Sequence, residues 1–484
     1  MTKNTSIHIG QLMQSSGVSF GTSGVRGLVS AMTDELCFAY TLAFAQTLNI
    51  APGARVAIAM DLRPSSPTIA AACHAALSFA GVETVFCGAL PTPALAFYAE
   101  QQKMPGIMIT GSHIPFDRNG IKFYSAEGEI TKAHEQTIST AQVHLPNVDF
   151  SQPLPSVNLA AKEFYLSRYR NYFAPNCLAG LSLAIYEHSS VARDLIKTLL
   201  IDLGANVISL GRTDEFVPID TEAVAKVDVE RAKKWANEYQ FDAIISTDGD
   251  ADRPLLGDET GQWMRGDIVG LLTAQFLGID AIATPVSCNT AIEASDCFKE
   301  IKRTRIGSPY VIEAMQALMK NSAIKIAGFE ANGGFLLGST LNSSNGQLAA
   351  LCTRDAVLPM LAVIALAKQK KCKLSALTMA LPARLTASDR IQNFPTENSR
   401  TILQKLAAQP ISIKELLGDL CGELANIDQT DGLRMTFKSG DIVHFRPSGN
   451  APELRCYAEA ADQTRADTLV AESLLRIKTF LSNA

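Results

Sequence analysis

Three aspartates at alternate positions are the residues of this chain best suited to chemistry. Asp248, Asp250 and Asp252 follow an apolar run, residues 241–246, that predicts a buried strand. Carboxylate oxygens at this spacing are typical ligands of Mg²⁺ or Ca²⁺, although a solvated acidic turn is the alternative without a metal. Arg253 beside them is consistent with an anionic phosphate as a further partner. An EF-hand calcium loop is the strongest competing interpretation, but it requires glycine where Arg253 stands and a helix where the strand is predicted.

A serine on a short loop is the second candidate. Ser112 follows residues 107–109, a predicted strand, and therefore lies just past the strand's C-terminal end, where open α/β sheets bind ligands. Gly111 permits a close backbone approach, and His113 could orient or shuttle a proton, although most Ser-His pairs are ordinary loop residues. A hydroxyl that carries phosphate and a carboxylate cage that holds Mg²⁺ would work together in phosphoryl transfer. We therefore interpret Ser112 and the aspartates as two halves of one phosphoryl-transfer site.

Two basic residues could assist at such a site. Asn119-Gly120 predicts a turn that delivers Lys122 from a short strand, and Lys122 could donate a proton or neutralise phosphate. A solvated surface lysine is the alternative interpretation. Arg26 belongs to a glycine-rich stretch, residues 21–27, which could wrap phosphate or serve only as a flexible entry loop.

The stretch from Arg446 to Arg455 has the composition of a phosphate-binding loop. The Ser448-Gly449-Asn450 turn exposes successive N–H groups, which form a concave anion site. The two arginines flank this turn and can bind phosphate bidentately. Two arginines near an ordinary turn are the alternative.

A polar turn is the fifth segment of interest. Glu330 and Asn332 follow a strand predicted at residues 324–327, and they could exchange hydrogen bonds with sugar hydroxyls. On its own this signal is weak, because polar turns are common.

The elements that must position these groups follow two patterns. Residues 55–86, 181–210 and 281–306 each show a β-branched run, a loop, a helix and a second strand, which argues for parallel sheets with helical crossovers. Near the C-terminus, residues 435–458 predict a hairpin and a further strand, and residues 464–482 predict a helix. The last domain is therefore expected to be α+β with an antiparallel sheet.

Composition shifts divide the chain. Residues 146–158 contain three prolines and no helical period, and softer boundaries lie near residues 258–261 and 368–371. The expected domains are 1–150 with Ser112, 159–258 with the aspartates, 259–370 with Glu330, and 372–484 with the phosphate-binding loop.

The overall composition excludes several classes of protein. The 484 residues are 47% hydrophobic and 19% charged, as in a globular protein, and the net charge of −5 gives no general attraction for nucleic acid or an anionic membrane. No apolar run reaches the ~18–20 residues of a membrane span, and the N-terminus lacks the apolar stretch of a signal peptide. Ten scattered cysteines without a Cys-x-x-Cys pair fit reduced thiols in the cytoplasm.

Taken together and in this order, the five segments resemble the α-D-phosphohexomutase family. Residues 110–115 match its phosphoserine pattern, Thr-Ala/Gly-Ser-His-x-Pro, with Ile114 where asparagine is usual, and residues 248–253 match its metal loop at every ligand. In the phosphate-binding loop, Asn450 replaces threonine and Ala451 replaces glutamate, which leaves the backbone amides available.

The sugar loop departs most from the family pattern, Gly-Glu-x-Ser-Gly-His. Asn332 replaces the serine, and Gly334 stands where the histidine is usual. The lost histidine is expected to leave extra room, so an acetylhexosamine substrate is an open alternative. Glu330 keeps the pattern, and in the family it reads the hydroxyls at C3 and C4, which point the same way in mannose and glucose.

The resemblance implies four domains around a central cleft: three βαβ-type mixed α/β domains and a C-terminal α+β domain. It implies an isomerase that interconverts hexose 1-phosphate and hexose 6-phosphate, most of all mannose and also glucose, through a phosphoserine and a hexose 1,6-bisphosphate. A phosphoacetylglucosamine or phosphoglucosamine mutase, a metal-dependent sugar phosphatase and a non-catalytic sugar-phosphate sensor are the alternatives. The expected partner is a phosphosugar, without nucleic acid or membrane, and the enzyme is expected to be a monomer or homodimer. The implied site residues are, for catalysis, Ser112, His113, Lys122, Arg26 and Arg253; for Mg²⁺, Ser112, Asp248, Asp250 and Asp252; for the sugar, Glu330, Asn332 and Gly307; and for phosphate, Arg446, Ser448, Gly449, Asn450 and Arg455.

Overall fold

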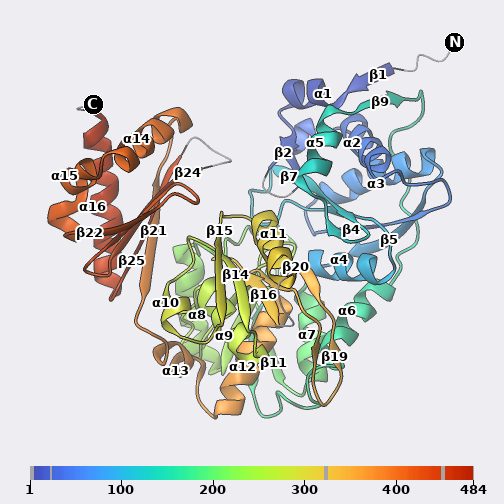
Figure 1. Cartoon of the computed structure of the whole chain (residues 1–484). Helices are drawn as coiled ribbons and strands as arrows, with labels where there is room; N and C mark the ends of the chain where they lie inside the picture. The colour runs from blue at the N-terminus through green and yellow to red at the C-terminus, as the bar shows by residue number, and fades with distance from the viewer. Residues whose placement is uncertain (1–4, 22–23, 321–324, 449–452, 483–484) are drawn as a thin grey trace.

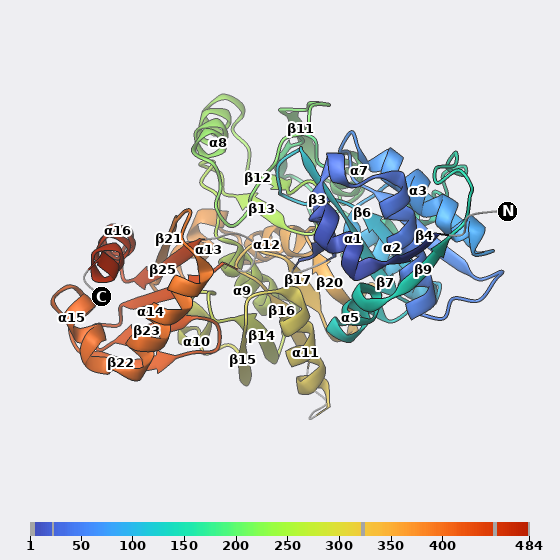
Figure 2. The same cartoon turned by 90° about the horizontal axis from the view of Figure 1, so that it is seen from above.

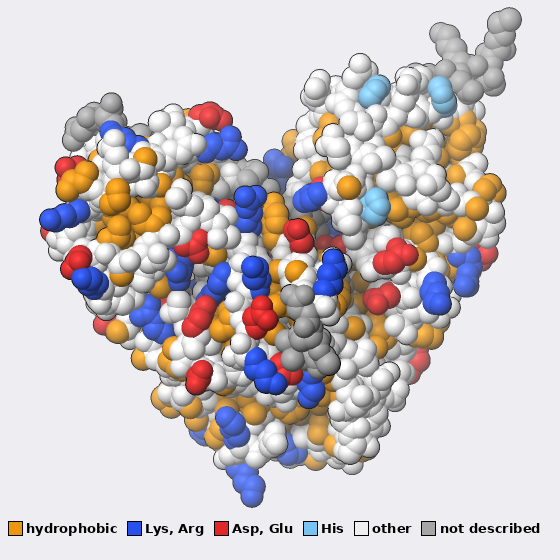
Figure 3. Space-filling view, viewed as in Figure 1, with side chains coloured by type: hydrophobic (Ala, Val, Ile, Leu, Met, Phe, Trp, Pro, Cys, Tyr) orange, Lys and Arg blue, Asp and Glu red, His pale blue; other side chains and the backbone are white. Residues whose placement is uncertain are grey.

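The chain folds into four sheet-based units that surround a central hollow. The computed structural model describes residues 5–21, 24–320, 325–448 and 453–482. The N-terminal and C-terminal units form two lobes on opposite sides of the middle pair (Figure 1), as the view from above also shows (Figure 2). The molecular surface is hollowed between these lobes (Figure 3). The predicted fold class, three mixed α/β units followed by an α+β unit around a cleft, is confirmed.

The N-terminal sheet runs in the order β2-β3-β7-β6-β4-β5. β4 (Arg55–Met60) pairs in parallel with β5 (Glu83–Ala89) and β6 (Gly106–Ile109), and its consecutive buried apolar residues suit a strand covered on both faces. The crossover helices are α3 (Ser66–Phe79) and α4 (Thr92–Gln101). The βαβ unit predicted from residues 55–86 is therefore confirmed.

β7 (Arg118–Ser125) lies antiparallel to both β6 and β3 (Val25–Leu28). The turn predicted at Asn119-Gly120 is wrong, because pairing with β3 extends the strand through both residues. Lys122 consequently lies inside a long strand that is buried over most of its length. The other elements of this unit are β1 (Thr5–His8), α1 (Ile9–Ser16), β2 (Ser19–Phe20), the 3₁₀ turn η1 (Val29–Ala31), α2 (Asp34–Thr47), β8 (Gly128–Glu129), α5 (Lys132–Thr140) and β9 (Gln142–Leu145).

The second sheet has the order β11-β10-β12-β13. β10 (Ser182–Tyr186) is parallel to β11 (Asn206–Leu210) and to β12 (Ala243–Thr247), and α7 (Arg193–Asp202) forms the crossover. β13 (Pro254–Gly257) returns antiparallel to β12, so the aspartate loop connects two neighbouring strands. The two remaining helices are α6 (Ala160–Arg170) and α8 (Lys226–Tyr239).

The third sheet has the order β15-β14-β16-β17-β20. β14 (Ala281–Pro285) is parallel to β15 (Glu300–Thr304) and β16 (Ile326–Phe329), whereas β17 (Phe335–Leu337) and β20 (Leu351–Asp355) are antiparallel. The loop that carries Glu330 follows the C-terminal end of β16, just as the aspartate loop follows β12. The other elements are α9 (Gly266–Leu277), α10 (Ala291–Ala294), α11 (Ser308–Met319), β18 (Leu341–Asn342), β19 (Gln347–Leu348), α12 (Val357–Lys370) and α13 (Leu374–Met379).

The C-terminal sheet is antiparallel throughout, in the order β21-β25-β24-β23-β22. β23 (Leu433–Phe437) and β24 (Ile442–Pro447) form the predicted hairpin, and β25 (Leu454–Ala460) follows it. The last helix, α16 (Gln463–Ser482), also lies where the sequence predicts it. The other elements are β21 (Leu385–Ile391), α14 (Thr396–Ala408), α15 (Pro410–Cys421) and β22 (Leu424–Asp428).

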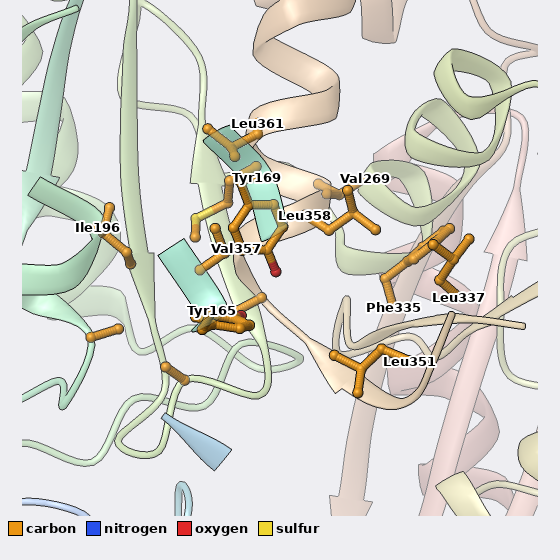
Figure 4. Close-up of a cluster of buried hydrophobic side chains, with 14 of the residues drawn as sticks. Tyr165, Tyr169, Ile196, Val269, Phe335, Leu337, Leu351, Val357, Leu358 and Leu361 are labelled. Carbon is orange, nitrogen blue, oxygen red and sulfur yellow. The ribbon is translucent and has the colours of Figure 1, made fainter. Parts of the chain in front are cut away.

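One buried hydrophobic cluster extends through the first three units, from Ala57 in β4 to Leu377 in α13. Figure 4 shows part of it, where α6 meets α12 and the third sheet. There Tyr165 and Tyr169 of α6 both donate hydrogen bonds to the buried carboxylate of Asp355. The C-terminal unit has a separate hydrophobic cluster of its own. The domain boundaries expected from the sequence stay predictions.

No helix within the described part of the chain has both the length and the apolar character that a membrane crossing requires.

Candidate active site

The serine loop and the aspartate loop meet, as the sequence predicts. Ser112 follows β6 and has φ 53°, so its backbone is in the left-handed region, and its side chain is fully buried. Its N–H donates to Thr110 Oγ1, which stabilises the tight turn. Its Oγ donates to Asp248 Oδ2 at 2.6 Å. This bond joins segments that lie more than a hundred residues apart in the sequence and in different sheets.

A buried arginine, Arg63, stabilises the serine loop through hydrogen bonds to backbone carbonyl groups. The guanidinium of Arg63, which is 1% exposed, pairs with Asp61 and lies 4.0 Å from the ring of Phe216. A Cβ at Gly111 would lie 2.5 Å from Arg63 Cζ, so glycine is required at this close approach. Arg63 was not predicted from the sequence, although an arginine in the loop that follows a buried parallel strand is a signal that could have found it. Its Nη1 and Nη2 atoms donate to four carbonyl oxygens of the serine loop and the start of β7, those of Ser112, Ile114, Pro115 and Arg118.

The three aspartates form a compact, buried cluster. One oxygen from each of Asp248, Asp250 and Asp252 lies within 4.8 Å of the others. Asp250 Oδ1 and Asp252 Oδ1 are buried without a hydrogen-bond partner. Oxygens in this state suit a hard cation such as Mg²⁺, because the ion would replace the hydration that burial removes. The loop lies between two strands rather than two helices, so the EF-hand interpretation is wrong, and the burial also rules out a solvated turn.

Lys122 lies against this cluster and not on the surface. Its Nζ donates to Asp250 Oδ2 at 2.7 Å and to Asp252 Oδ2 at 2.8 Å. Burial alone would lower the pKa of this ammonium group, but the two carboxylates outweigh burial and raise the pKa. Thr92 Oγ1 donates to Asp250 Oδ2 at 2.6 Å. Burial and the two neighbouring carboxylates raise the pKa of Asp248, as expected for three acids gathered in one place.

The other predicted catalytic residues surround the same cluster. Arg253 Nε lies 3.5 Å from Asp252 Oδ1. His113 Nδ1 is 3.3 Å from Ser112 Oγ, and the Arg253 charge together with burial lowers the pKa of His113, which keeps the imidazole neutral. Burial, reinforced by the charge of Arg253, lowers the pKa of Arg26 to about 10.

The predicted sugar loop reaches this cluster through an arginine that was not predicted from the sequence. Arg354, at the end of β20, donates from Nη1 to Glu330 Oε2 at 3.1 Å and from Nη2 to Asp252 Oδ2 at 2.8 Å. The expectation of extra room at Gly334 is wrong, because the side chain of Arg354 fills this space. A Cβ at Gly334 would lie 2.5 Å from Arg354 Cδ. Asn332 Oδ1 accepts a hydrogen bond from Gly334 N, which fixes this side chain within the turn.

Gly307, the third predicted sugar-binding residue, precedes α11 with φ 132°. Its carbonyl accepts hydrogen bonds from the backbone N–H groups of Tyr310 and Val311 in the first turn of the helix, and its role in sugar binding stays a prediction.

The predicted phosphate-binding loop belongs to the C-terminal sheet. Arg446 and Arg455 are direct partners across β24 and β25, which places their side chains on one face at the base of the loop. Arg446 Nε donates to Asp431 Oδ2, and Ser448 N donates to the carbonyl of Glu453. Arg446 and Ser448 also line a cavity of about 370 Å³. The predicted ligands Gly449 and Asn450 lie outside the described residues.

Family models and relatives described as phosphoglucomutases or phosphomannomutases match this chain. Three family models described as phosphoglucomutase/phosphomannomutase match it in order: α/β/α domain I at residues 17–144, α/β/α domain III at residues 265–385, and the C-terminal domain at residues 378–475. The phosphomannomutase of Salmonella muenchen is 48% identical over 478 residues, 98% of each chain. That of Sinorhizobium fredii is 45% identical over 468 residues, 95% of this chain and 98% of the relative.

A solved structure has the same fold. A phosphoglucomutase/phosphomannomutase family protein from Burkholderia thailandensis aligns with a TM-score of 0.72 at 18% identity, over 95% of this chain and 97% of that chain.

Proposed function

We infer the function from one premise: this chain belongs to the α-D-phosphohexomutase family. It is an isomerase that moves a phosphoryl group within a hexose phosphate. We propose that its main substrate pair is mannose 1-phosphate and mannose 6-phosphate, because the relatives at 45% and 48% identity are phosphomannomutases. Glucose phosphates are the proposed second substrates. The observation that carries the mechanism is the hydrogen bond from Ser112 Oγ to Asp248.

We propose that Ser112 carries the phosphoryl group. In the first transfer, the bond between Ser112 Oγ and phosphorus breaks, and a bond forms from the free sugar hydroxyl to the same phosphorus. The sugar hydroxyl loses its proton and Ser112 gains one, so the step is balanced, and His113 is within reach of Oγ for this exchange. The resulting hexose 1,6-bisphosphate turns over in the cleft. A second transfer then returns its other phosphate to Ser112.

The residues present fit a bound Mg²⁺. Asp250 Oδ1 and Asp252 Oδ1 are buried without a hydrogen-bond partner, and an oxygen of Asp248 lies close to both residues. With the phosphate on Ser112, these three side chains would hold the ion, which would supply charge neutralisation at the transferring phosphoryl group. Lys122 orients two of the carboxylates through its hydrogen bonds.

The remaining groups are proposed to bind the substrate. Glu330 would accept hydrogen bonds from the sugar hydroxyls at C3 and C4, and Asn332 and Gly307 are the further residues proposed for the sugar site. Arg253 and Arg26 add positive charge beside the reacting phosphate. Arg446, Ser448, Gly449, Asn450 and Arg455 are proposed to hold the phosphate that does not react.

We propose a cytoplasmic enzyme that acts as a monomer or a homodimer on a phosphosugar. All ten cysteines are free thiols, and most of them are buried, which is consistent with a reducing compartment.

The test of this function is the replacement of the nucleophile. Ser112→Ala is expected to lower kcat for mannose 1-phosphate about a thousandfold or more, while thermal unfolding changes little. Incubation with glucose 1,6-bisphosphate should add one phosphate, detected by mass spectrometry, to the wild type and none to the variant. Ser78→Ala, at an exposed serine of the same unit, is the matched control. Near-normal turnover of Ser112→Ala would rule out this mechanism.

A further inference from the structure

Arg354 bonds to two carboxylates that come from different loops of the site. The whole residue is 3% exposed. Nε and Nη2 donate to Asp252 Oδ2 at 3.1 and 2.8 Å, and Nη1 donates to Glu330 Oε2 at 3.1 Å. One rigid, planar guanidinium therefore fixes an aspartate of the metal cluster relative to the carboxylate of the sugar loop.

The contact with Arg354 decides which oxygen of Asp252 is left without a hydrogen bond. Arg354 and Lys122 both donate to Oδ2, whereas Oδ1 is buried without a hydrogen-bond partner and lies 3.5 Å from Arg253 Nε. A rotated Asp252 would expose a different oxygen to the other aspartates. The orientation of the Asp252 side chain, and with it the geometry of the aspartate cluster, therefore depends on both Arg354 and Lys122.

The sugar loop is built around the stem of the same arginine. A Cβ at Gly334 would lie 2.5 Å from Arg354 Cδ, 2.7 Å from Cγ and 3.0 Å from Cβ. These are the near atoms of a buried side chain that is bonded at its far end, so they cannot move away without loss of the hydrogen bonds. Glu330 N donates to the carbonyl of Gly334, which closes the loop over the arginine. Any side chain at position 334 would therefore displace Arg354, Glu330 or both.

We propose that Arg354 is a positioning residue that sets the orientations of Asp252 and Glu330 together, and that glycine is required at position 334 to admit it. This inference rests on the proposed function, in which Asp252 binds Mg²⁺ and Glu330 binds the sugar. It predicts that metal binding and sugar binding fail together when Arg354 is replaced. Lysine is a poor substitute, because one ammonium on a flexible stem cannot reproduce three fixed N–H bonds to two carboxylates.

The first experiment measures Mg²⁺ binding to the dephosphorylated protein by isothermal titration calorimetry, and kcat and KM for mannose 1-phosphate. Arg354→Lys should weaken Mg²⁺ binding about tenfold or more, the size typical of a lost partner of a metal ligand, and should raise KM about tenfold. Arg303→Lys is the matched control, because Arg303 is a half-buried arginine of the third sheet that pairs with Glu293 instead. It should leave both quantities within about twofold. If Arg354→Lys matches the wild type in both, the proposal is overturned.

The second experiment is a double-mutant cycle with thermal unfolding as its readout. Gly334→Ala should lower the unfolding temperature and weaken Mg²⁺ binding in the wild-type background. In the Arg354→Ala background the same change should have little further effect, because the clashing stem is gone. Equal effects of Gly334→Ala in both backgrounds would overturn the spatial argument. Neither the calorimetry nor the unfolding cycle needs turnover, so a wild type without mutase activity would refute the proposed function and leave the inference on Arg354 to be decided separately.

Discussion

The first three units and the C-terminal unit are built in different ways. A single hydrophobic cluster runs through the first three, whereas the C-terminal unit encloses its own. Buried hydrogen bonds also cross between the first three, from Ser112 to Asp248, from Thr92 to Asp250 and from Arg354 to Asp252. These units therefore behave as one rigid body around the reacting groups.

The C-terminal unit is attached mainly through polar contacts. Glu459 of β25 accepts hydrogen bonds from the backbone N–H and side chain of Thr290 and from Arg384. Arg305 Nε donates to the carbonyl of Thr430. Polar junctions of this kind permit relative movement of the parts they join. The proposed reacting groups are therefore held in fixed positions, while the part proposed to hold the non-reacting phosphate can adjust as the bisphosphate changes its orientation.

The largest effect is expected at the centre of the rigid body. Asp250→Asn keeps the side-chain shape but removes a charged ligand that also holds Lys122 and Thr92, so kcat should fall about a thousandfold and the Mg²⁺ requirement should increase. Removal of Mg²⁺ with EDTA should abolish activity of the wild type. Steady-state kinetics over a range of MgCl₂ concentrations measures both. Asp214→Asn, at an exposed position, is the control. A loss below tenfold for Asp250→Asn would show that this region is not the reaction centre.

Arg63 gives the second largest effect. Arg63→Ala leaves four carbonyl groups without their donor and Asp61 without its buried partner, so the free energy of unfolding should fall by about 3–5 kcal/mol. The serine loop would lose its support, and kcat should fall about a hundredfold. Urea unfolding and kinetics test this, with Arg55→Ala at the exposed start of β4 as the control. An unfolding free energy like that of the wild type would contradict the supporting role.

His444 provides a test confined to the C-terminal unit. It is buried on β24, and its Nε2–H donates to the carbonyl of Asp431. Burial, reinforced by the charges of Arg434 and Arg446, lowers the pKa of His444 to about 4, against the opposing effect of Asp431. The ring of Tyr457 lies 5.5 Å from the imidazole.

The folded-state pKa of His444 is below the ordinary value of about 6.5. The contribution of the neutral, buried His444 to the free energy of unfolding is therefore complete above pH 6.5. It is lost as the pH falls from about 6.5 through 4, since the unfolded chain takes up a proton that the folded one does not. The full loss corresponds to ~3 kcal/mol. Because the C-terminal unit has its own core, we expect it to unfold in a transition of its own, measured by calorimetry at several pH values. His444→Gln should flatten the pH dependence of that transition alone. His144→Gln, at an exposed site, should leave the pH dependence unchanged. A change in the transition of the first three units would argue against separate cores.

The smallest effect is expected at the junction itself. Glu459→Gln removes the negative charge of the carboxylate that accepts hydrogen bonds from Arg384 and Thr290. The loss of this ion pair should lower the free energy of unfolding by about 1 kcal/mol. KM for mannose 1-phosphate should rise about fivefold, while kcat stays within about twofold, because the reacting groups are not touched. Glu423→Gln, in an exposed pair with Lys438, is the control. A larger effect on kcat than on KM would show that the junction governs the reaction centre.

Residue type and position after a strand were enough to predict that Ser112 and the aspartates lie together. Ser112 and Asp248 carry polar side chains directly after buried apolar runs, and such loops gather at one edge of a sheet. Arg63 and Arg354 escaped prediction because their partners are backbone carbonyls and carboxylates brought close only by the fold. The same reason explains the error at Gly334, since a missing side chain in the sequence does not reveal that Arg354 fills the space.

The shared hydrophobic cluster also sets an order of assembly during synthesis. A separate cluster on the N-terminal sheet, with the residues packed against it, uses only residues 7–154, so this sheet, with the Ser112 loop at its edge, can condense as soon as that part of the chain has emerged. The cluster that joins the first three units extends to Leu377. At the usual rate of about 5–20 residues per second, the ribosome needs roughly tens of seconds to reach that point. Throughout this interval the nascent chain exposes apolar surface that later residues will cover, which makes this stage the one most open to aggregation and to chaperone binding.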